Sequence, residues 1–310
     1  MRIYTKLSGS FRKLPCPAVA LGMFDGMHIG HQSIVRRAVE LARANEGTAM
    51  VFTFANHPMS VLAPERMPLA IGSRELRQQI LEELGVEVLL EIPFTKALSR
   101  RSPEEFLKLL QRGFAPRYLV TGPNYTFGRL GKGTGRMLLR DGERYGFQAE
   151  ICPAVLRDGR PVSSTRVRAL IAEGNLERAN EFLGRPFTYC SRVVHGERRG
   201  RMLGFPTANL VIPAGSAMVP NGAYAVRVSL RGMEYDGLAN VGSNPTFGDG
   251  NARRLEVNIQ NFSDDIYDVL VSVQFLEKLR DEQRFPSVEL LVRQLRKDRE
   301  KAERIWREWQ

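Results

Sequence analysis

The first 186 residues alternate between short apolar runs and stretches whose apolar residues recur at helical spacing. The expected strands are 18–21, 48–54, 86–92, 118–121 and 148–152, and the expected helices are 31–44, 73–84, 102–112 and 164–173. The helix at 102–112 opens with a capping box that has proline at the first helical position. Strands that alternate with helices pair in parallel. This half therefore predicts an α/β fold, a doubly wound and mostly parallel sheet with helices on both faces.

After residue 186 the pattern becomes rich in β-strands separated by Gly, Pro and Asn turns. Strands are expected at 187–194, 223–230, 235–241, 255–259 and 269–275, and a long amphipathic helix at 287–309. The expected apolar side of this helix carries Leu290, Leu291, Leu295, Ala302, Ile305 and Trp309. Polar and apolar residues alternate through 224–230, as a half-buried antiparallel strand requires. We predict two domains, residues 1–186 and residues 187–310, the second a small antiparallel β-barrel with a C-terminal helix.

The composition of the chain indicates the cellular compartment. The N-terminus is basic but no apolar segment follows it, and no stretch approaches 18 apolar residues. The three cysteines, Cys16, Cys152 and Cys190, are dispersed, which suits a reducing environment. We therefore expect a soluble cytoplasmic protein that does not contact membranes, and the sequence carries no signal for its oligomeric state.

The formal net charge of +11 calls for anionic partners. Only eight of the 45 basic residues are lysines, and an excess of arginine suits bidentate binding of phosphate, although it also follows from genomic composition or heat adaptation. The charge is spread along the chain, without a basic block interleaved with aromatic residues. We expect no dedicated nucleic-acid partner.

The first motif with recognisable chemistry joins the strand at 18–21 to the next helix. It supplies three glycines and two histidines three residues apart, in the order Gly22, Phe24, Asp25, Gly26, His28, Gly30 and His31. A strand-to-helix turn directs backbone N–H groups and the positive end of the helix toward a phosphate. The alternatives are surface histidines, or a metal site completed by His57, but no cysteine or carboxylate cluster completes a ligand set.

A second motif lies in the other half, between residues 196 and 210. Gly196 and Gly204 allow backbone amides to approach phosphates, and Thr207 and Asn209 present oxygen ligands on one face of an extended segment. Those oxygens could bind Mg²⁺, or the segment could be a plain Gly/Pro-rich hairpin. Neither half has a Walker A motif, because position 126, where its first glycine would stand, is Thr.

Together these motifs resemble a known family. Gly-x-Phe-Asp-Gly-x-His-x-Gly-His at 22–31, Phe-Gly at 127–128, Val-Ser-Ser-Thr-x-x-Arg at 162–168, Gly-Phe-Pro-Thr-Ala-Asn at 204–209, Leu-Glu-Val at 255–257 and Leu-Arg at 279–280 follow the order of the bacterial bifunctional riboflavin kinase/FAD synthetases. The resemblance covers essentially the whole chain. It implies a Rossmann-like nucleotidyltransferase domain that converts FMN and ATP to FAD and pyrophosphate, followed by a barrel that phosphorylates riboflavin to FMN, both with Mg-ATP.

The resemblance also implies roles for individual residues. On the nucleotidyltransferase side, nucleotide or flavin phosphate would be bound by Gly22, Phe24, Asp25, Gly30, Asn124, Ser163, Ser164, Thr165 and Arg168, and His28 and His31 would stabilise charge on the ATP phosphates. On the kinase side, Gly196, Gly204, Thr207 and Asn209 would hold Mg-ATP, Arg280 would lie near the flavin, and Glu256 would be the base. Ser164 could instead be a simple helix N-cap, and Glu256 could pair with Arg253 or Arg254 on a solvent face.

The chain departs from the family pattern at several positions. Many members have Phe-Glu-Pro-His-Pro at 54–58, where this chain has Ala55 and Asn56, and many have Asp where it has Asn124. Near the expected base, residues that are usually His, Asp and Gly are replaced by Asn258, Asn261 and Asp268. Three other functions share parts of the pattern: a class I aminoacyl-tRNA synthetase, whose Lys-Met-Ser-Lys-Ser loop is not recognisable here, a single-activity FAD synthetase with a degenerate kinase barrel, and a flavin-sensing regulator that binds nucleic acid.

Overall fold

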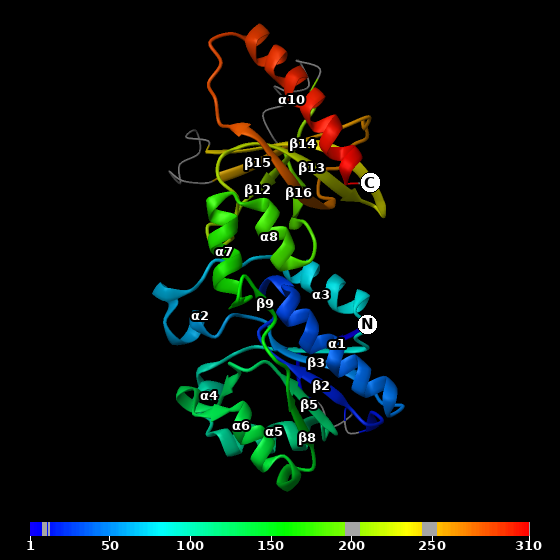
Figure 1. Cartoon of the computed structure of the whole chain (residues 1–310), viewed down its shortest axis with the longest axis vertical. Coiled ribbons are helices and arrows are strands. Elements are labelled where there is room, and N and C mark those ends of the chain that lie inside the picture. Colours follow the sequence, from blue (N-terminus) through cyan, green and yellow to red (C-terminus); the bar gives the residue numbers. More distant parts are fainter. Residues whose placement is uncertain (8–10, 12, 196–204, 244–252, 310) are drawn as a thin grey trace. The chain divides into compact units, whose positions relative to one another are not determined.

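The computed structural model describes residues 1–7, 11, 13–195, 205–243 and 253–309 (Figure 1). The chain forms two compact units. The first comprises residues Met1–Pro68 and Arg77–Ser163, and the second comprises Leu69–Leu76 and Ser164–Gln310. The structure thus assigns residues 164–186 and a short segment of the N-terminal half, Leu69–Leu76, to the same unit as the β-rich half. Whether residues 187–310 fold alone stays a prediction.

The first unit contains a six-stranded parallel sheet. Its strands are β1 (Arg2–Tyr4), β2 (Ala18–Leu21), β3 (Ala49–Phe54), β4 (Val88–Ile92), β5 (Tyr118–Thr121) and β8 (Gln148–Ile151), in the spatial order β1-β4-β3-β2-β5-β8. The helices before residue 164 are α1 (Ile29–Ala44), α2 (Met59–Leu62), α3 (Arg74–Glu83), α4 (Lys96–Ser99), α5 (Pro103–Phe114) and α6 (Gly135–Asp141). Two small hairpins, β6 (Thr126–Phe127) with β7 (Gly133–Thr134) and β9 (Leu156–Arg157) with β10 (Arg160–Pro161), complete this half.

Helices cover both faces of this sheet, as the sequence predicts (Figure 1). On one face Val19, Leu21 and Phe52 pack against the buried side of α5. On the other face α1 contacts β2, β3 and β5. The predicted capping box of α5 is present: Ser102 Oγ accepts the Glu105 amide at 3.2 Å, and Glu105 Oε2 accepts the Ser102 amide at 2.7 Å.

The second unit is built on a closed barrel of six antiparallel strands. They are β11 (Phe187–Val194), β12 (Ala208–Val211), β13 (Gly222–Leu230), β14 (Met233–Ser243), β15 (Arg253–Ile259) and β16 (Leu270–Asp281), in the order β11-β12-β15-β14-β13-β16. Helices α7 (Ser164–Glu173) and α8 (Leu176–Leu183) precede the barrel, and α10 (Val288–Glu308) follows it. None of the helices in the part of the chain that the structure describes is long and apolar enough to span a membrane.

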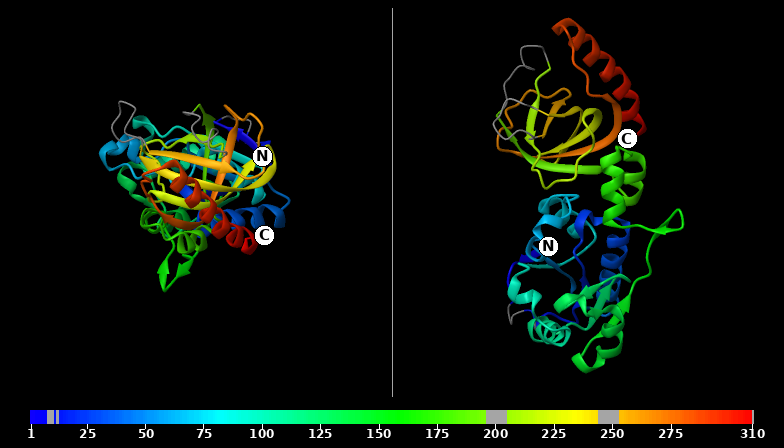
Figure 2. Two further views of the ribbon diagram at one scale, coloured as in Figure 1. Left: turned by 90° about the horizontal axis from the view of Figure 1, so that it is seen from above. Right: turned by 90° about the vertical axis from the view of Figure 1, so that its left-hand side faces the viewer.

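Helix α10 lies along the outside of the barrel (Figure 2). Ala302, Ile305 and Trp306 pack on outward-facing residues of β13, β14 and β16, among them Ala225, Leu238 and Leu276. The predicted apolar side is therefore wrong at its ends: Leu290 is 45% and Trp309 40% exposed, whereas Trp306 is 5% exposed. Trp306 follows Ala302 by four residues, which places both side chains on the face of the helix that contacts the barrel.

Candidate active sites

The strand order of the parallel sheet reverses beside β2. Strands β2, β3 and β4 are successive neighbours in one direction, and the chain then returns to place β5 on the other side of β2. Open α/β sheets bind their ligands at the carboxyl ends of the strands at such a reversal. The turn with the two histidines follows β2, and Asn124 follows β5, so both lie at this edge of the sheet. The topology thus brings together two motifs separated by about ninety residues in the sequence.

His28 and His31 are fixed by their position at the start of α1. His28 is the N-cap, and its Nδ1 accepts the His31 backbone amide at 3.2 Å. The two imidazole rings stack with their centroids 3.7 Å apart. The ring of Phe24 makes a T-shaped contact with that of His31, with the two centroids 5.5 Å apart. The stack therefore places both imidazoles at the N-terminal turn of α1.

Burial, and secondly the neighbouring His28, lower the pKa of His31 well below its ordinary value of 6.5. The ring of His31 is therefore neutral at pH 7 in the protein without ligand. Within the described part of the chain its buried Nδ1 has no hydrogen-bond partner. An imidazole in this state can donate to an incoming phosphate, or take up a proton as negative charge approaches.

The neighbourhood of Gly30 links the histidine turn to the Ser-Ser-Thr-x-x-Arg motif. A Cβ on Gly30 would lie 3.2 Å from the His28 ring and 3.7 Å from the carbonyl oxygen of Val162, the residue before Ser163. Glycine thus permits the close approach of these two segments. Ser164, Thr165 and Arg168 continue into α7, where the Arg168 guanidinium donates to the Leu69 carbonyl at 2.6 Å.

In the barrel, the strand register places Glu256 between two asparagines. Glu256 on β15 pairs with Asn209 on β12 and with Asn240 on β14. Its neighbours Leu255 and Val257 are buried inside the barrel, so Glu256 projects from the outer face, as the sequence predicts. The three polar side chains form a row across adjacent strands, because residues at paired positions share one face of a sheet.

Sequence reasoning missed Asn240. It lies in an alternating strand whose pattern only shows that it points outward, and pairing it with Glu256 requires the register of β14 against β15. Thr207 lies just before β12, and its carbonyl oxygen accepts Asn209 Nδ2 at 3.4 Å, which leaves Asn209 Oδ1 as the acceptor atom of that amide. Gly196 and Gly204, which we expected to approach nucleotide phosphates, lie outside the described residues.

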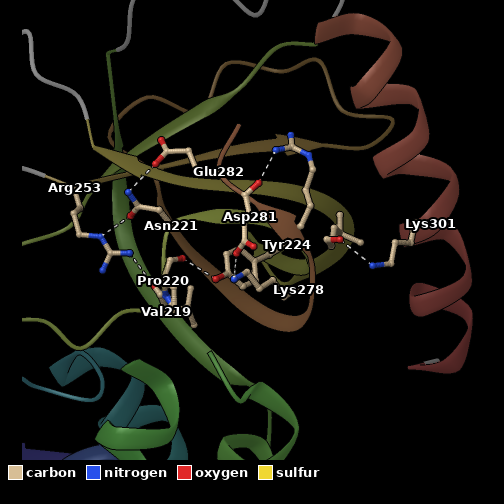
Figure 3. Close-up of polar contacts among 11 residues, drawn as sticks. Val219, Pro220, Asn221, Tyr224, Arg253, Lys278, Asp281, Glu282 and Lys301 are labelled. Atoms are coloured by element: carbon tan, nitrogen blue, oxygen red, sulfur yellow. Dashed lines mark hydrogen bonds and ion pairs between the residues drawn. The ribbon is translucent and has the colours of Figure 1, made fainter. Parts of the chain in front are cut away.

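Arg280, which we expected near the flavin, pairs with Asp298 of α10 at 2.9 Å and lies over the ring of Phe285. A polar network occupies the neighbouring end of the barrel (Figure 3). In it Asn221 accepts Arg253 Nε at 3.1 Å and donates to Glu282 at 2.9 Å. This network fixes the first residue of β15, three positions before Glu256.

The departures from the family pattern have structural consequences here. Asn56 donates to the Phe94 carbonyl at 3.1 Å and accepts the Phe94 amide at 2.8 Å. These two hydrogen bonds fix the backbone of Phe94, just after β4. Asn258 donates to the Pro206 carbonyl at 2.7 Å. Asn261 and Asp268 have φ of 54° and 60°, a left-handed conformation that Asn and Asp tolerate better than most residues other than Gly.

Both halves of the chain resemble known protein families. A sequence model of the FAD synthetase family matches residues 12–166, and one of the riboflavin kinase family matches residues 183–306. Curated bifunctional riboflavin kinase/FMN adenylyltransferases from Bacillus subtilis and Pseudomonas fluorescens are 32% and 37% identical to the chain, over 93% and 87% of its length and 92% and 87% of theirs. A crystal structure from Streptococcus pneumoniae, described as a macrolide-efflux protein, is 34% identical with a TM-score of 0.85, over 98% of this chain and 99% of that one.

Proposed function

Since the chain belongs to the bifunctional riboflavin kinase/FMN adenylyltransferase family, we propose that its parallel sheet and its barrel each carry one of these two activities. The barrel phosphorylates riboflavin to FMN, and the sheet transfers an adenylyl group from ATP to FMN, which gives FAD and pyrophosphate. The observation that carries this assignment is the separation of the chemistry: a histidine pair lies at the reversal point of the sheet, and a carboxylate lies beside Asn209 on the barrel.

For adenylyl transfer, His28 and His31 bind the ATP phosphates together with the first-turn amides of α1. As the FMN phosphate attacks the α-phosphorus, negative charge moves to the leaving pyrophosphate, and the imidazole N–H groups stabilise it. Stacking holds the two rings in place before ATP binds. Asn124 and Ser163 add polar groups at the same edge of the sheet. For Ser164, Thr165 and Arg168, a role with phosphate rests on the family motif alone.

For the kinase step, Glu256 accepts the proton of the riboflavin 5′-hydroxyl as that oxygen attacks the γ-phosphate. The hydroxyl of Thr207 and the amide oxygen of Asn209 are neutral oxygen ligands of the kind that Mg²⁺ takes together with nucleotide phosphates, so this pair suits the metal. Bound there, Mg²⁺ would neutralise charge on the β- and γ-phosphates. Arg280 is proposed to lie near the flavin.

Incubation of the purified chain with riboflavin, ATP and Mg²⁺, with the flavins separated over time, tests both activities. We expect FMN first and then FAD. His28→Ala and His31→Ala should each lower FAD formation by about 10²- to 10³-fold and leave FMN formation unchanged. Thr207→Ala and Asn209→Ala should each lower FMN formation from riboflavin, whereas added FMN should still be converted to FAD. A chain that makes only FAD from added FMN would be a single-activity enzyme, and one that binds flavin without turnover would contradict the proposal.

A further inference from the structure

The turn that carries the histidine pair has an unfavourable backbone conformation. Phe24 has φ 53° and ψ 33°, Gly26 has φ 76°, and Met27 has φ 44°, all in the left-handed region. Side chains with a Cβ avoid this region, so two of the three residues are held where an isolated chain would not place them. Such a turn persists only when the surrounding structure fixes it.

Two side chains hold the turn at one atom, the carbonyl oxygen of Met23. Thr53 Oγ1 donates to this oxygen at 3.2 Å, and an Arg77 guanidinium nitrogen donates to it at 3.4 Å. In a planar trans peptide the carbonyl and the next N–H point in opposite directions. Fixing the Met23 carbonyl therefore fixes the direction of the Phe24 N–H and the start of the left-handed segment.

Arg77 is itself placed by a buried carboxylate. It forms an ion pair with Glu91, whose side chain is 0% exposed, while that of Arg77 is 12% exposed. Glu91 lies on β4, Thr53 on β3, and Arg77 on α3, so three elements converge on the Met23 carbonyl. Forming a buried ion pair costs free energy, because both charges lose their hydration. An ion pair whose only role was to fill space could be replaced by apolar side chains.

From Phe24 the contacts continue to the histidine pair. The Phe24 ring is fully buried and makes a T-shaped contact with the His31 ring, with an angle of 79° between the two planes. Gly22 makes room for it, since a Cβ there would lie 2.9 Å from the Phe24 ring. A rotation of the Met23 peptide would therefore move the ring against which His31 rests.

We propose that Arg77, held by Glu91, is a positioning residue for adenylyl transfer. It acts through the Met23 carbonyl and the Phe24 ring to hold His31 where the ATP phosphates bind. The inference rests on the proposed role of the histidine pair. In this role Arg77 touches neither nucleotide nor flavin, and Thr53 is the second donor to the Met23 carbonyl.

The test uses the full chain and measures both activities in the same preparation. Arg77→Met should lower kcat for conversion of FMN to FAD by about 10- to 100-fold, the scale of a small misplacement of a catalytic group. Thr53→Val, which replaces the hydroxyl by a methyl group of similar size, should have a smaller effect of the same kind. Riboflavin kinase activity should be unchanged, because it depends on the barrel unit, and circular dichroism reports whether the parallel sheet is folded. Glu150→Gln removes another ion pair of the same unit, with Arg37, and should change neither activity.

A double-mutant cycle separates positioning from general damage. In a His31→Ala background, Arg77→Met should add less than about threefold further loss, because its effect passes through His31. If Arg77→Met leaves a buried carboxylate that unfolds the sheet, Arg77→Met with Glu91→Leu removes both charges and is expected to show the same loss of kcat. Normal FAD formation in the Arg77 variants, or a full multiplicative loss in the cycle, overturns the inference. A His31→Ala chain with normal FAD formation overturns the proposed histidine site itself.

Discussion

Glu256 is the residue on which the kinase mechanism depends. Glu256→Gln keeps the shape of the side chain and the neighbouring asparagines but removes the basic carboxylate. We expect FMN formation to fall by roughly 10²- to 10⁴-fold while riboflavin and ATP still bind, measured as kcat and KM in steady-state assays. Glu277→Gln, an exposed glutamate on β16, is the matched control and should keep full activity. Near-normal FMN production by the Glu256 variant would place the base elsewhere.

His31 gives the first unit a dependence of stability on pH. Because burial lowers the pKa of His31 in the folded chain, the unfolded chain binds a proton near pH 6.5 that the folded chain does not bind. The free energy of unfolding is therefore unaffected by His31 above its unfolded pKa. It should fall below that value, by at most about 1.4 kcal/mol per pH unit.

Urea unfolding followed by circular dichroism between about pH 7.5 and 5.5 measures this effect. The pH dependence should be weaker in His31→Gln than in the unmodified chain. The two tryptophans, Trp306 and Trp309, both lie in the second unit, so their fluorescence follows that unit separately and should not respond to the substitution. Identical pH profiles for the two chains would contradict a neutral His31 with a lowered pKa.

Some functional side chains can be predicted from the sequence because their neighbours in sequence are also their neighbours in space. His28 and His31 are such a pair, since one turn of helix brings them together. Asn240, Arg77 and Glu91 cannot be found in this way. Their significance comes from strand register and from the packing of α3 on the sheet, and a charged residue inside the apolar run of β4 gives no indication of its partner.

At the scale of elements, α10 is attached to the barrel by an ion pair as well as by apolar contacts. The side chains of Arg280 and Asp298 are 14% and 6% exposed, and Gln294 also donates to Asp298 at 2.8 Å. Asp298→Ala should lower the free energy of unfolding of the second unit by about 3–5 kcal/mol, because it leaves the arginine charge buried without its partner.

Tryptophan fluorescence during urea unfolding measures this loss directly, since both tryptophans are on or next to α10. Arg280→Met combined with Asp298→Leu removes both charges and should restore much of the stability. A loss below about 1 kcal/mol in Asp298→Ala would show that the pair behaves as an exposed one.

Elements with a continuous apolar run or a helical repeat can be predicted from the sequence, even when they are short. The sequence predicts β5 and α7 with the bounds that the structure has. It does not predict β1, α8 or the two small hairpins. Three residues of β1 carry too little alternation to indicate a strand, and pairing with β4 decides its structure. In α10 the apolar stripe predicts the helix, but only packing on the barrel selects Trp306 over Trp309.

At the scale of the whole molecule, residues before 187 complete the barrel unit. Asn180 on α8 accepts the Phe187 amide at 2.7 Å and donates to the Phe275 carbonyl at 3.3 Å. A fragment that begins at residue 187 lacks this side chain and leaves the buried Phe275 carbonyl without that donor, at a cost of about 1–3 kcal/mol.

Fragments 164–310 and 187–310 test this point. Both should phosphorylate riboflavin if the barrel folds alone, but the longer one should unfold at a higher urea concentration by tryptophan fluorescence. Asn180→Ala in the longer fragment should account for part of the difference. Equal stability of the two fragments would show that residues 164–186 do not stabilise the barrel and that the domain boundary lies after residue 186.

The segment Leu69–Leu76 determines which residues must be exchanged together when halves of two related chains are recombined. Ala70 accepts the Ala217 amide and donates to the Gly215 carbonyl, both at 2.8 Å, so eight residues from the N-terminal half belong to the barrel unit. The chain therefore passes between the units at three places, after residues 68, 76 and 163. A chimaera joined at a single crossover would combine one parent's segment with the other parent's barrel. Functional recombination must carry residues 69–76 and 164–310 from the same parent, and one proteolytic cut after residue 163 divides the second unit rather than releasing it.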